Sequence, residues 1–327
     1  MAVEFPESFL TLLEAAKREW APLGRIHVIK NLAGGRSGAP VLHVDIDPGD
    51  AYDATISPGQ YVLKMQEYKV WDNSPEPTEN RRHRQAEAAN ADFARAHIPG
   101  LVKEFQNGQS VALLYQIAGS NLEDYCTGYA AYDSDAPSIH RIGQDMLFDL
   151  LAHWNQKVEL RYGVTPHDLF RDWLGYRLNP SKARPLHEFV NALTAGQPTV
   201  VIQHENLINP LWLTDCDELT CEEVVISGLI HGDLHPGNLM LHREVASDPY
   251  WLIDFELSCQ APLGYDHAYF ELALILRHLL GQDPERLFTL LKALEAPEGT
   301  KEAKHVAIKD AGLLDFGFIR KERTFSK

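Results

Sequence analysis

The stretch LIHGDLHPGNLML at residues 229–241 constrains the fold of this chain more than any other segment. Apolar residues flank a polar centre, and Pro236 and Gly237 interrupt any helix that would place the two histidines on one face. The pattern is therefore typical of a strand, a turn and a second strand. The β-rich run PYWLIDFELS at residues 249–258 follows and contains Asp254. We expect Asp233, Asn238 and Asp254 to converge where neighbouring strands end.

These three side chains offer carboxylate and amide oxygens. Such hard ligands suit Mg²⁺, which favours one or two carboxylates together with phosphate oxygens and water. An aspartate that does not bind the metal can orient a hydroxyl for attack. Two alternatives stay open on the residues alone. In one, Asp233 and Asn238 only form a turn; in the other, His231, Asp233 and His235 hold zinc or iron in a metal hydrolase.

The N-terminal part of the chain predicts a small antiparallel sheet. Two β-rich runs within residues 26–46 are joined by a loop that contains Gly34, Gly35 and Gly38, and the strand YVLKM with Lys64 follows. Residues 81–97 have helical periodicity, and residues 101–116 form two further strands around an Asn-Gly turn. An amphipathic helix over residues 6–20 precedes the sheet.

Beyond residue 120 the pattern becomes mainly helical. At 327 residues the chain exceeds the usual size of one hydrophobic core. We therefore predict two lobes, residues 1–119 and residues 120–327, with the boundary at 117–121. Residues 160–225 mix helical and β-rich stretches and permit no assignment.

Charge and composition exclude several classes of partner. The net charge of −16 argues against a nucleic-acid partner, which needs lysine and arginine on its binding face, and it suits a cationic one. The four cysteines have no CxxC spacing, so neither a zinc ribbon nor a disulfide framework is indicated. No run approaches the ~18 apolar residues of a membrane helix. Glu4 and Glu7 do not fit a signal peptide, so we expect no membrane partner and a cytoplasmic location.

The motifs resemble one known family. Asp233 and Asn238 have the D-x-x-x-x-N spacing of a kinase catalytic loop, with HGD in place of His-Arg-Asp, and IDFE stands where protein kinases have Asp-Phe-Gly. In these features the chain resembles the aminoglycoside phosphotransferase and choline kinase-like family. The resemblance implies an α+β, two-lobed protein-kinase-like fold. Its smaller lobe has an antiparallel sheet with one key helix, and its larger lobe is mainly α-helical.

The resemblance also implies a role for each candidate residue. Asp233 would orient the acceptor hydroxyl, while Asn238 and Asp254 would hold Mg²⁺ against ATP. The backbone at Gly34, Gly35 and Gly38 would approach the ATP phosphates, and Lys64 would contact them. Glu87 would pair with Lys64, and Glu79 is the alternative partner. Glu271 would support the catalytic loop from a helix, and Asp266 is a second candidate for that role. His231 would form a structural hydrogen bond, whereas His235 would be an ordinary loop residue.

Taken together, the resemblance implies an ATP- and Mg²⁺-dependent phosphotransferase that acts on a hydroxyl of a small molecule. The acceptor would be aminoglycoside-, choline- or amino-sugar-like. The alternative is a kinase-fold regulatory or nucleotide-binding module without turnover, which would bind a nucleotide or a protein partner as part of a larger signalling system.

Overall fold

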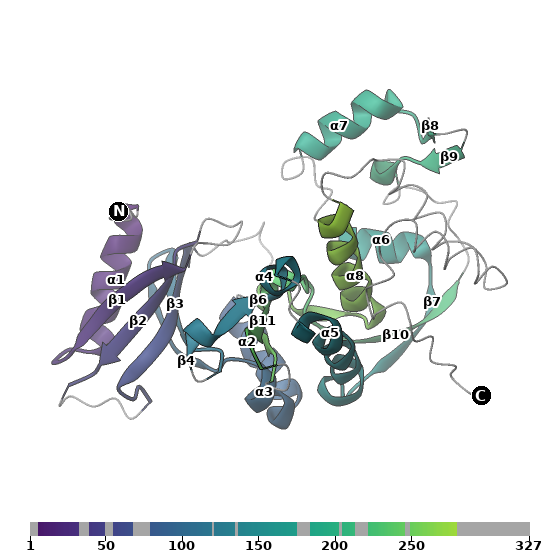
Figure 1. Cartoon of the computed structure of the whole chain (residues 1–327). Helices are drawn as coiled ribbons and strands as arrows, with labels where there is room; N and C mark the ends of the chain where they lie inside the picture. The colour runs from purple at the N-terminus through teal and green to yellow at the C-terminus, as the bar shows by residue number, and fades with distance from the viewer. Residues whose placement is uncertain are drawn as a thin grey trace. The chain divides into compact units, whose positions relative to one another are not determined.

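The computed structural model describes most of the chain (Figure 1). The described residues are 6–32, 39–49, 55–67, 79–119, 121–134, 137–174, 184–202, 205–212, 222–245 and 249–279.

Two compact units make up the chain. The first contains residues 1–157 and 229–327, and the second contains residues 158–228. The predicted lobe boundary at 117–121 lies inside the first unit and does not coincide with the division between the two units. The division into lobes 1–119 and 120–327 therefore stays a prediction.

A five-stranded antiparallel sheet forms the N-terminal part of the first unit, with the strand order β1-β2-β3-β5-β4. Its strands are β1 (Arg25–Leu32), β2 (Val41–Asp47), β3 (Gly59–Glu67), β4 (Leu101–Asn107) and β5 (Ser110–Gln116). Helix α1 (Glu7–Trp20) packs on this sheet through the apolar stripe that the sequence predicts, including Leu13, Ala16 and Trp20 (Figure 1). Strands that follow one another in sequence pair in this sheet because their connections are short. Within the sheet, only the pair of β3 and β5 joins strands that are not consecutive in sequence.

The helix predicted over residues 81–97 is two helices, α2 (Glu79–Ala89) and α3 (Ala91–His97). Asn90 separates them with an extended backbone, and its side chain accepts hydrogen bonds from the backbone N–H groups of Asp92 and Phe93. An asparagine in this position caps the N-terminus of the second helix. The predicted helix is therefore divided in two because Asn90 caps a new helix in the middle of the periodic apolar pattern.

The rest of the first unit carries short strands between helices. A three-stranded sheet has the order β12-β11-β6. Its core gathers apolar side chains such as Met146, Trp154, Leu241 and Phe270, which are almost fully buried. The elements are η1 (Leu122–Asp124), β6 (Tyr125–Thr127), α4 (Gly128–Asp133), α5 (Pro137–Asp149), the π-helical turn η2 (Leu150–Trp154), η4 (Pro236–Asn238), β11 (Leu239–His242), β12 (Trp251–Leu252), β13 (Cys259–Pro262) and α8 (Gly264–Leu279).

The second unit corresponds to the region that the sequence left unassigned. Strand β7 (Glu159–Val164) pairs antiparallel with β10 (Glu223–Ile230), and β8 (Thr199–Ile202) pairs with β9 (Glu205–Ile208). Helices α6 (Pro166–Leu174) and α7 (Arg184–Thr194) and the turn η3 (Pro210–Trp212) complete it.

Helices and antiparallel sheets together confirm the α+β class, and the N-terminal part has the predicted order of three strands, a helical segment and two further strands. Among the helices in the described ranges, none has the length and apolar character needed to cross a membrane.

Candidate active site

Lys64 lies at the centre of a buried charge cluster. It stands on β3 with 8% of its surface exposed. Its Nζ is 2.8 Å from Glu79 Oε2 and donates a hydrogen bond of 2.9 Å to Asp254 Oδ1. A lysine is rarely buried unless it is paired, so these two carboxylates explain how the ammonium is held inside the protein.

The partner predicted for Lys64 is wrong. Glu87 lies two turns farther along α2, where its Oε1 accepts a hydrogen bond of 3.0 Å from the Leu101 backbone N–H and lies 3.5 Å from His83 Nε2. Glu79 takes the predicted position because it is the first residue of α2 and is buried beside the sheet. The proline-rich residues before it made this end of the helix difficult to place from sequence.

The two carboxylates keep Lys64 charged. Burial by itself would lower the pKa of Lys64, but Glu79 and Asp254 outweigh burial and raise that pKa above its ordinary value. For the acid Asp254, burial would instead raise the pKa, but the attraction of Lys64 outweighs burial and lowers that pKa. The cluster therefore carries a lysine cation beside an aspartate anion at neutral pH.

The catalytic-loop segment is held by a buried carboxylate. Asp266, on the first turn of α8, accepts hydrogen bonds from the backbone N–H of His231 at 2.6 Å and of Gly232 at 3.0 Å. Gly232 has φ of 78°, and a Cβ at this position would lie 2.2 Å from the Leu257 carbonyl oxygen. Only glycine allows this left-handed backbone to approach its neighbour so closely.

The brace expected of Glu271 is therefore supplied by Asp266. Glu271 lies later on α8 with its side chain exposed, whereas Asp266 is 3% exposed. Because Cβ atoms on a helix point toward its N-terminus, a short acidic side chain in the first turn reaches the backbone in front of the helix. The sequence offered both acids, and the position on the helix decides between them.

Hydrogen bonds to backbone groups bring together the segments that carry Asp233, Asn238 and Asp254. Asn238 Nδ2 donates to the Asp233 carbonyl oxygen at 2.9 Å, and the Asn238 carbonyl accepts from the Ile253 N–H at 3.0 Å. His231 Nε2 lies 2.9 Å from the Ile253 carbonyl oxygen. Asp254 itself has φ of 67°, a left-handed conformation that is uncommon outside glycine. Strain of this kind is characteristic of functional positions.

His235 has a structural part that the sequence did not indicate. Its Nδ1 accepts a hydrogen bond of 2.9 Å from the Gly237 N–H and so caps the turn η4. Its Nε2 lies 3.8 Å from Asp233 Oδ2, and its ring stacks on Tyr129 at 5.7 Å between centroids. Because Nδ1 of His235 and Nε2 of His231 both face backbone groups, these nitrogens do not favour a zinc or iron site.

Oxygen donors surround Asp254. Ligand atoms of Glu79, Asp254 and Glu256 lie within 4.8 Å of one another, and the residues described here contain no second cluster of this kind. The backbone carbonyl of Asn238 accepts a hydrogen bond from Ile253, the residue before Asp254, so Asn238 lies on a neighbouring segment. A set made only of carboxylate and amide oxygens fits Mg²⁺. Glu256 was part of the IDFE motif but was not among the predicted metal ligands.

Comparison with known proteins addresses the same segment. The model of the phosphotransferase enzyme family matches residues 212–291. No curated protein matches the chain. Among solved structures, the microcompartment-associated aminopropanol kinase aligns with a TM-score of 0.41 at 14% identity, over 94% of this chain and 94% of that chain. A likeness of that size carries no argument about fold or function.

The family match confirms the chain as a phosphotransferase. The matched residues include Asp233, Asn238 and Asp254, on which much of the predicted resemblance to aminoglycoside phosphotransferases and choline kinases rests, and that resemblance is confirmed as well. The coarse activity follows: this is a kinase that acts on a small-molecule substrate.

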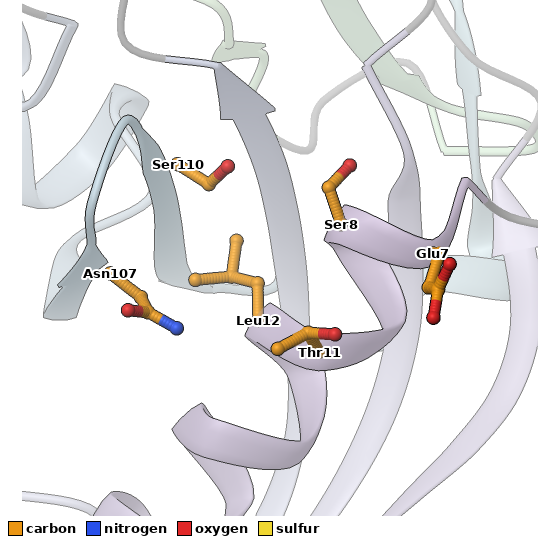
Figure 2. A pocket seen from close by; sticks show the side chains of 6 residues that line it. All are labelled: Glu7, Ser8, Thr11, Leu12, Asn107 and Ser110. Carbon is orange, nitrogen blue, oxygen red and sulfur yellow. The ribbon is translucent and has the colours of Figure 1, made fainter.

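The predicted nucleotide-binding residues Gly34, Gly35 and Gly38 lie outside the described residues. A hollow of about 390 Å³ lies between α1 and the β4–β5 hairpin and is lined by six residues (Figure 2). It shares no residue with the charge cluster, and we assign it no part in the chemistry. Its lining residues are Glu7, Ser8, Thr11, Leu12, Asn107 and Ser110.

Proposed function

We propose that this phosphotransferase transfers the γ-phosphate of ATP, with Mg²⁺, to a hydroxyl group of a cationic small molecule. The observation that carries the proposal is the position of Lys64 between Glu79 and Asp254, in the same unit as the loop that bears Asp233 and Asn238. Kinases need these groups together, because phosphoryl transfer depends mainly on positioning and on neutralising charge.

Each side chain has a defined task in this reaction. The acceptor hydroxyl donates its proton toward the Asp233 carboxylate while its oxygen forms a bond to the γ-phosphorus. The bond from that phosphorus to the β–γ bridging oxygen breaks, and ADP leaves with the electron pair. Lys64 binds the phosphates as a cation, and Glu79 keeps its ammonium in place. Asp266 keeps the loop rigid through the His231 and Gly232 N–H groups.

Asp254 and Asn238 are the proposed Mg²⁺ ligands, and Glu256 is close enough to Asp254 to contribute. When bound, Mg²⁺ would neutralise charge on the phosphate oxygens. The hydrogen bond from the Ile253 N–H to the Asn238 carbonyl oxygen holds the two ligand-bearing segments together.

The acceptor is proposed to resemble an aminoglycoside, choline or an amino sugar. The net charge of −16 supports a cationic acceptor, because an acidic protein attracts cations by its overall field. The same charge argues against nucleic acid. The cytoplasm, the location expected from the sequence, would supply the ATP.

The test is ADP release from Mg-ATP by the purified protein. Pools of aminoglycosides, choline with ethanolamine, amino sugars, nucleosides and protein substrates are added separately, with Asp233→Ala as the blank. We expect release that depends on one cationic pool and disappears in Asp233→Ala, while calorimetry shows that this variant still binds Mg-ATP.

Other outcomes are equally informative. Turnover close to wild type in Asp233→Ala would remove Asp233 from the mechanism. Binding of Mg-ATP without ADP release in any pool would favour the regulatory module without turnover. Release that depends only on the nucleoside or protein pool would refute the cationic acceptor.

A further inference from the structure

Tyr115 on β5 contacts the charge cluster from a side that no motif indicated. Its hydroxyl donates a hydrogen bond of 2.9 Å to Glu79 Oε1. We propose that the Tyr115 hydroxyl is a positioning group that fixes the Glu79 carboxylate and, through it, the ammonium of Lys64 for binding nucleotide phosphates. The inference rests on the proposed function, because it gives Lys64 a nucleotide to bind.

The register of the sheet places Tyr115 beside Lys64. In the antiparallel pair of β3 and β5, Lys64 is opposite Leu113 and Val62 is opposite Tyr115. Opposite residues share a face of the sheet, and so do residues two apart on one strand. Tyr115 and Lys64 are therefore diagonal neighbours on one face, and both can reach the Glu79 side chain that lies over it.

The two oxygens of Glu79 are divided between these neighbours. Oε2 lies 2.8 Å from Lys64 Nζ, and Oε1 accepts from the Tyr115 hydroxyl. Two partners on two oxygens fix the plane of the carboxylate, whereas one partner leaves it free to turn about its last bond. Glu79 is 4% exposed, so water gives little compensation for a lost donor.

The ring of Tyr115 is itself held in place. His83 on α2 lies against it edge-on at 4.9 Å between centroids, and the same imidazole contacts Phe255, the neighbour of Asp254, at 5.3 Å. His83 Nε2 is in turn 2.9 Å from the Pro99 carbonyl oxygen. Because the buried His83 ring packs against the Tyr115 ring, Tyr115→Phe should remove the donor without moving the ring.

The chain offers a matched control for this substitution. Tyr61 on β3 is 8% exposed and Tyr115 is 9% exposed. The Tyr61 hydroxyl donates to the Ser57 carbonyl oxygen at 2.7 Å and has no place in the proposed site. Tyr61→Phe therefore removes a comparable buried hydroxyl from the same sheet. Thermal unfolding of both variants measures how much each loses in folding alone.

The experiment is calorimetric binding of Mg-ATP to the full-length wild type, Tyr115→Phe and Tyr61→Phe, each also in a Glu79→Ala background. We expect Tyr115→Phe to raise the Kd for Mg-ATP about tenfold, as for a lost hydrogen bond to a charged group. Tyr61→Phe should stay within about twofold of wild type. In the Glu79→Ala background, Tyr115→Phe should have no further effect, since the hydroxyl acts through Glu79.

Two results would overturn the inference while leaving the proposed function intact. One is a Kd for Tyr115→Phe equal to that of wild type. The other is a loss of affinity that is equally large in the Glu79→Ala background, which would show that Tyr115 does not act through Glu79. Failure of the wild type itself to bind Mg-ATP would refute the proposed function and this inference together.

Discussion

Replacing Asp266 tests how the catalytic loop is held. Asp266→Ala removes the acceptor of two buried N–H groups, those of His231 and Gly232. An unsatisfied buried donor costs about 1–3 kcal/mol, so two of them lower the free energy of unfolding by about 2–6 kcal/mol. Asp266→Asn keeps one acceptor oxygen but turns an amide N–H toward the second donor, and its loss should be about half as large.

Urea unfolding of Asp266→Ala, Asp266→Asn and Glu271→Gln measures these differences. Glu271 is the matched control because it is an acid on the same helix with an exposed side chain. We expect Glu271→Gln to stay within about 0.5 kcal/mol of wild type. The turnover of Asp266→Asn should fall while its Kd for Mg-ATP stays close to wild type, since the loop orients Asp233 and does not hold Lys64. Equal losses of stability in Asp266→Asn and Glu271→Gln would refute the assignment of Asp266 as the brace.

Three further perturbations follow from the same contacts. Glu79→Gln should raise the Kd for Mg-ATP about tenfold while Glu87→Gln leaves it unchanged, and the opposite order would restore Glu87 as the partner of Lys64. Gly232→Ala should reduce both the urea midpoint and turnover, because its Cβ would meet the Leu257 carbonyl; a fully active variant would contradict the close approach. Burial would raise the pKa of Glu87, but hydrogen bonds from His83 and the Leu101 N–H outweigh it and lower the pKa below its ordinary value. A carboxylate with a depressed pKa adds stability above its unfolded pKa and loses it as the pH falls through the folded pKa. The stability difference between wild type and Glu87→Gln should thus be largest at neutral pH and vanish in acid, and a difference independent of pH would exclude this effect.

Much of the N-terminal sheet could be predicted because its signals are local. The Asn107-Gly108 turn lies between β4 and β5, and Gly108 has the positive φ that such a turn requires. The Pro236-Gly237 turn likewise spaces Asp233 and Asn238. Turn chemistry and periodicity act within a few residues of the chain, so they are visible before any tertiary contact is known.

The second unit shows where such signals end. Its strands β7 and β10 pair although more than fifty residues separate their facing positions, as between Leu160 and Ile226. Short strands of this kind gain their stability from partners that are distant in sequence, and no periodicity within residues 160–225 identifies those partners.

The sequence by itself determined the phosphotransferase class, the spacing of Asp233 and Asn238, and the strand that carries Lys64. Only the tertiary structure decided which acid pairs with Lys64 and which acid holds the catalytic loop. Glu79 and Glu87 lie on one helix, and Asp266 and Glu271 lie on another, so composition and periodicity treat each pair alike. The choice depends on which side chain is buried against a partner far along the chain, as Lys64 is against Asp254 at a separation of 190 residues. Desolvation makes an unpaired charge costly there, and it is the packed fold that brings the pairs together.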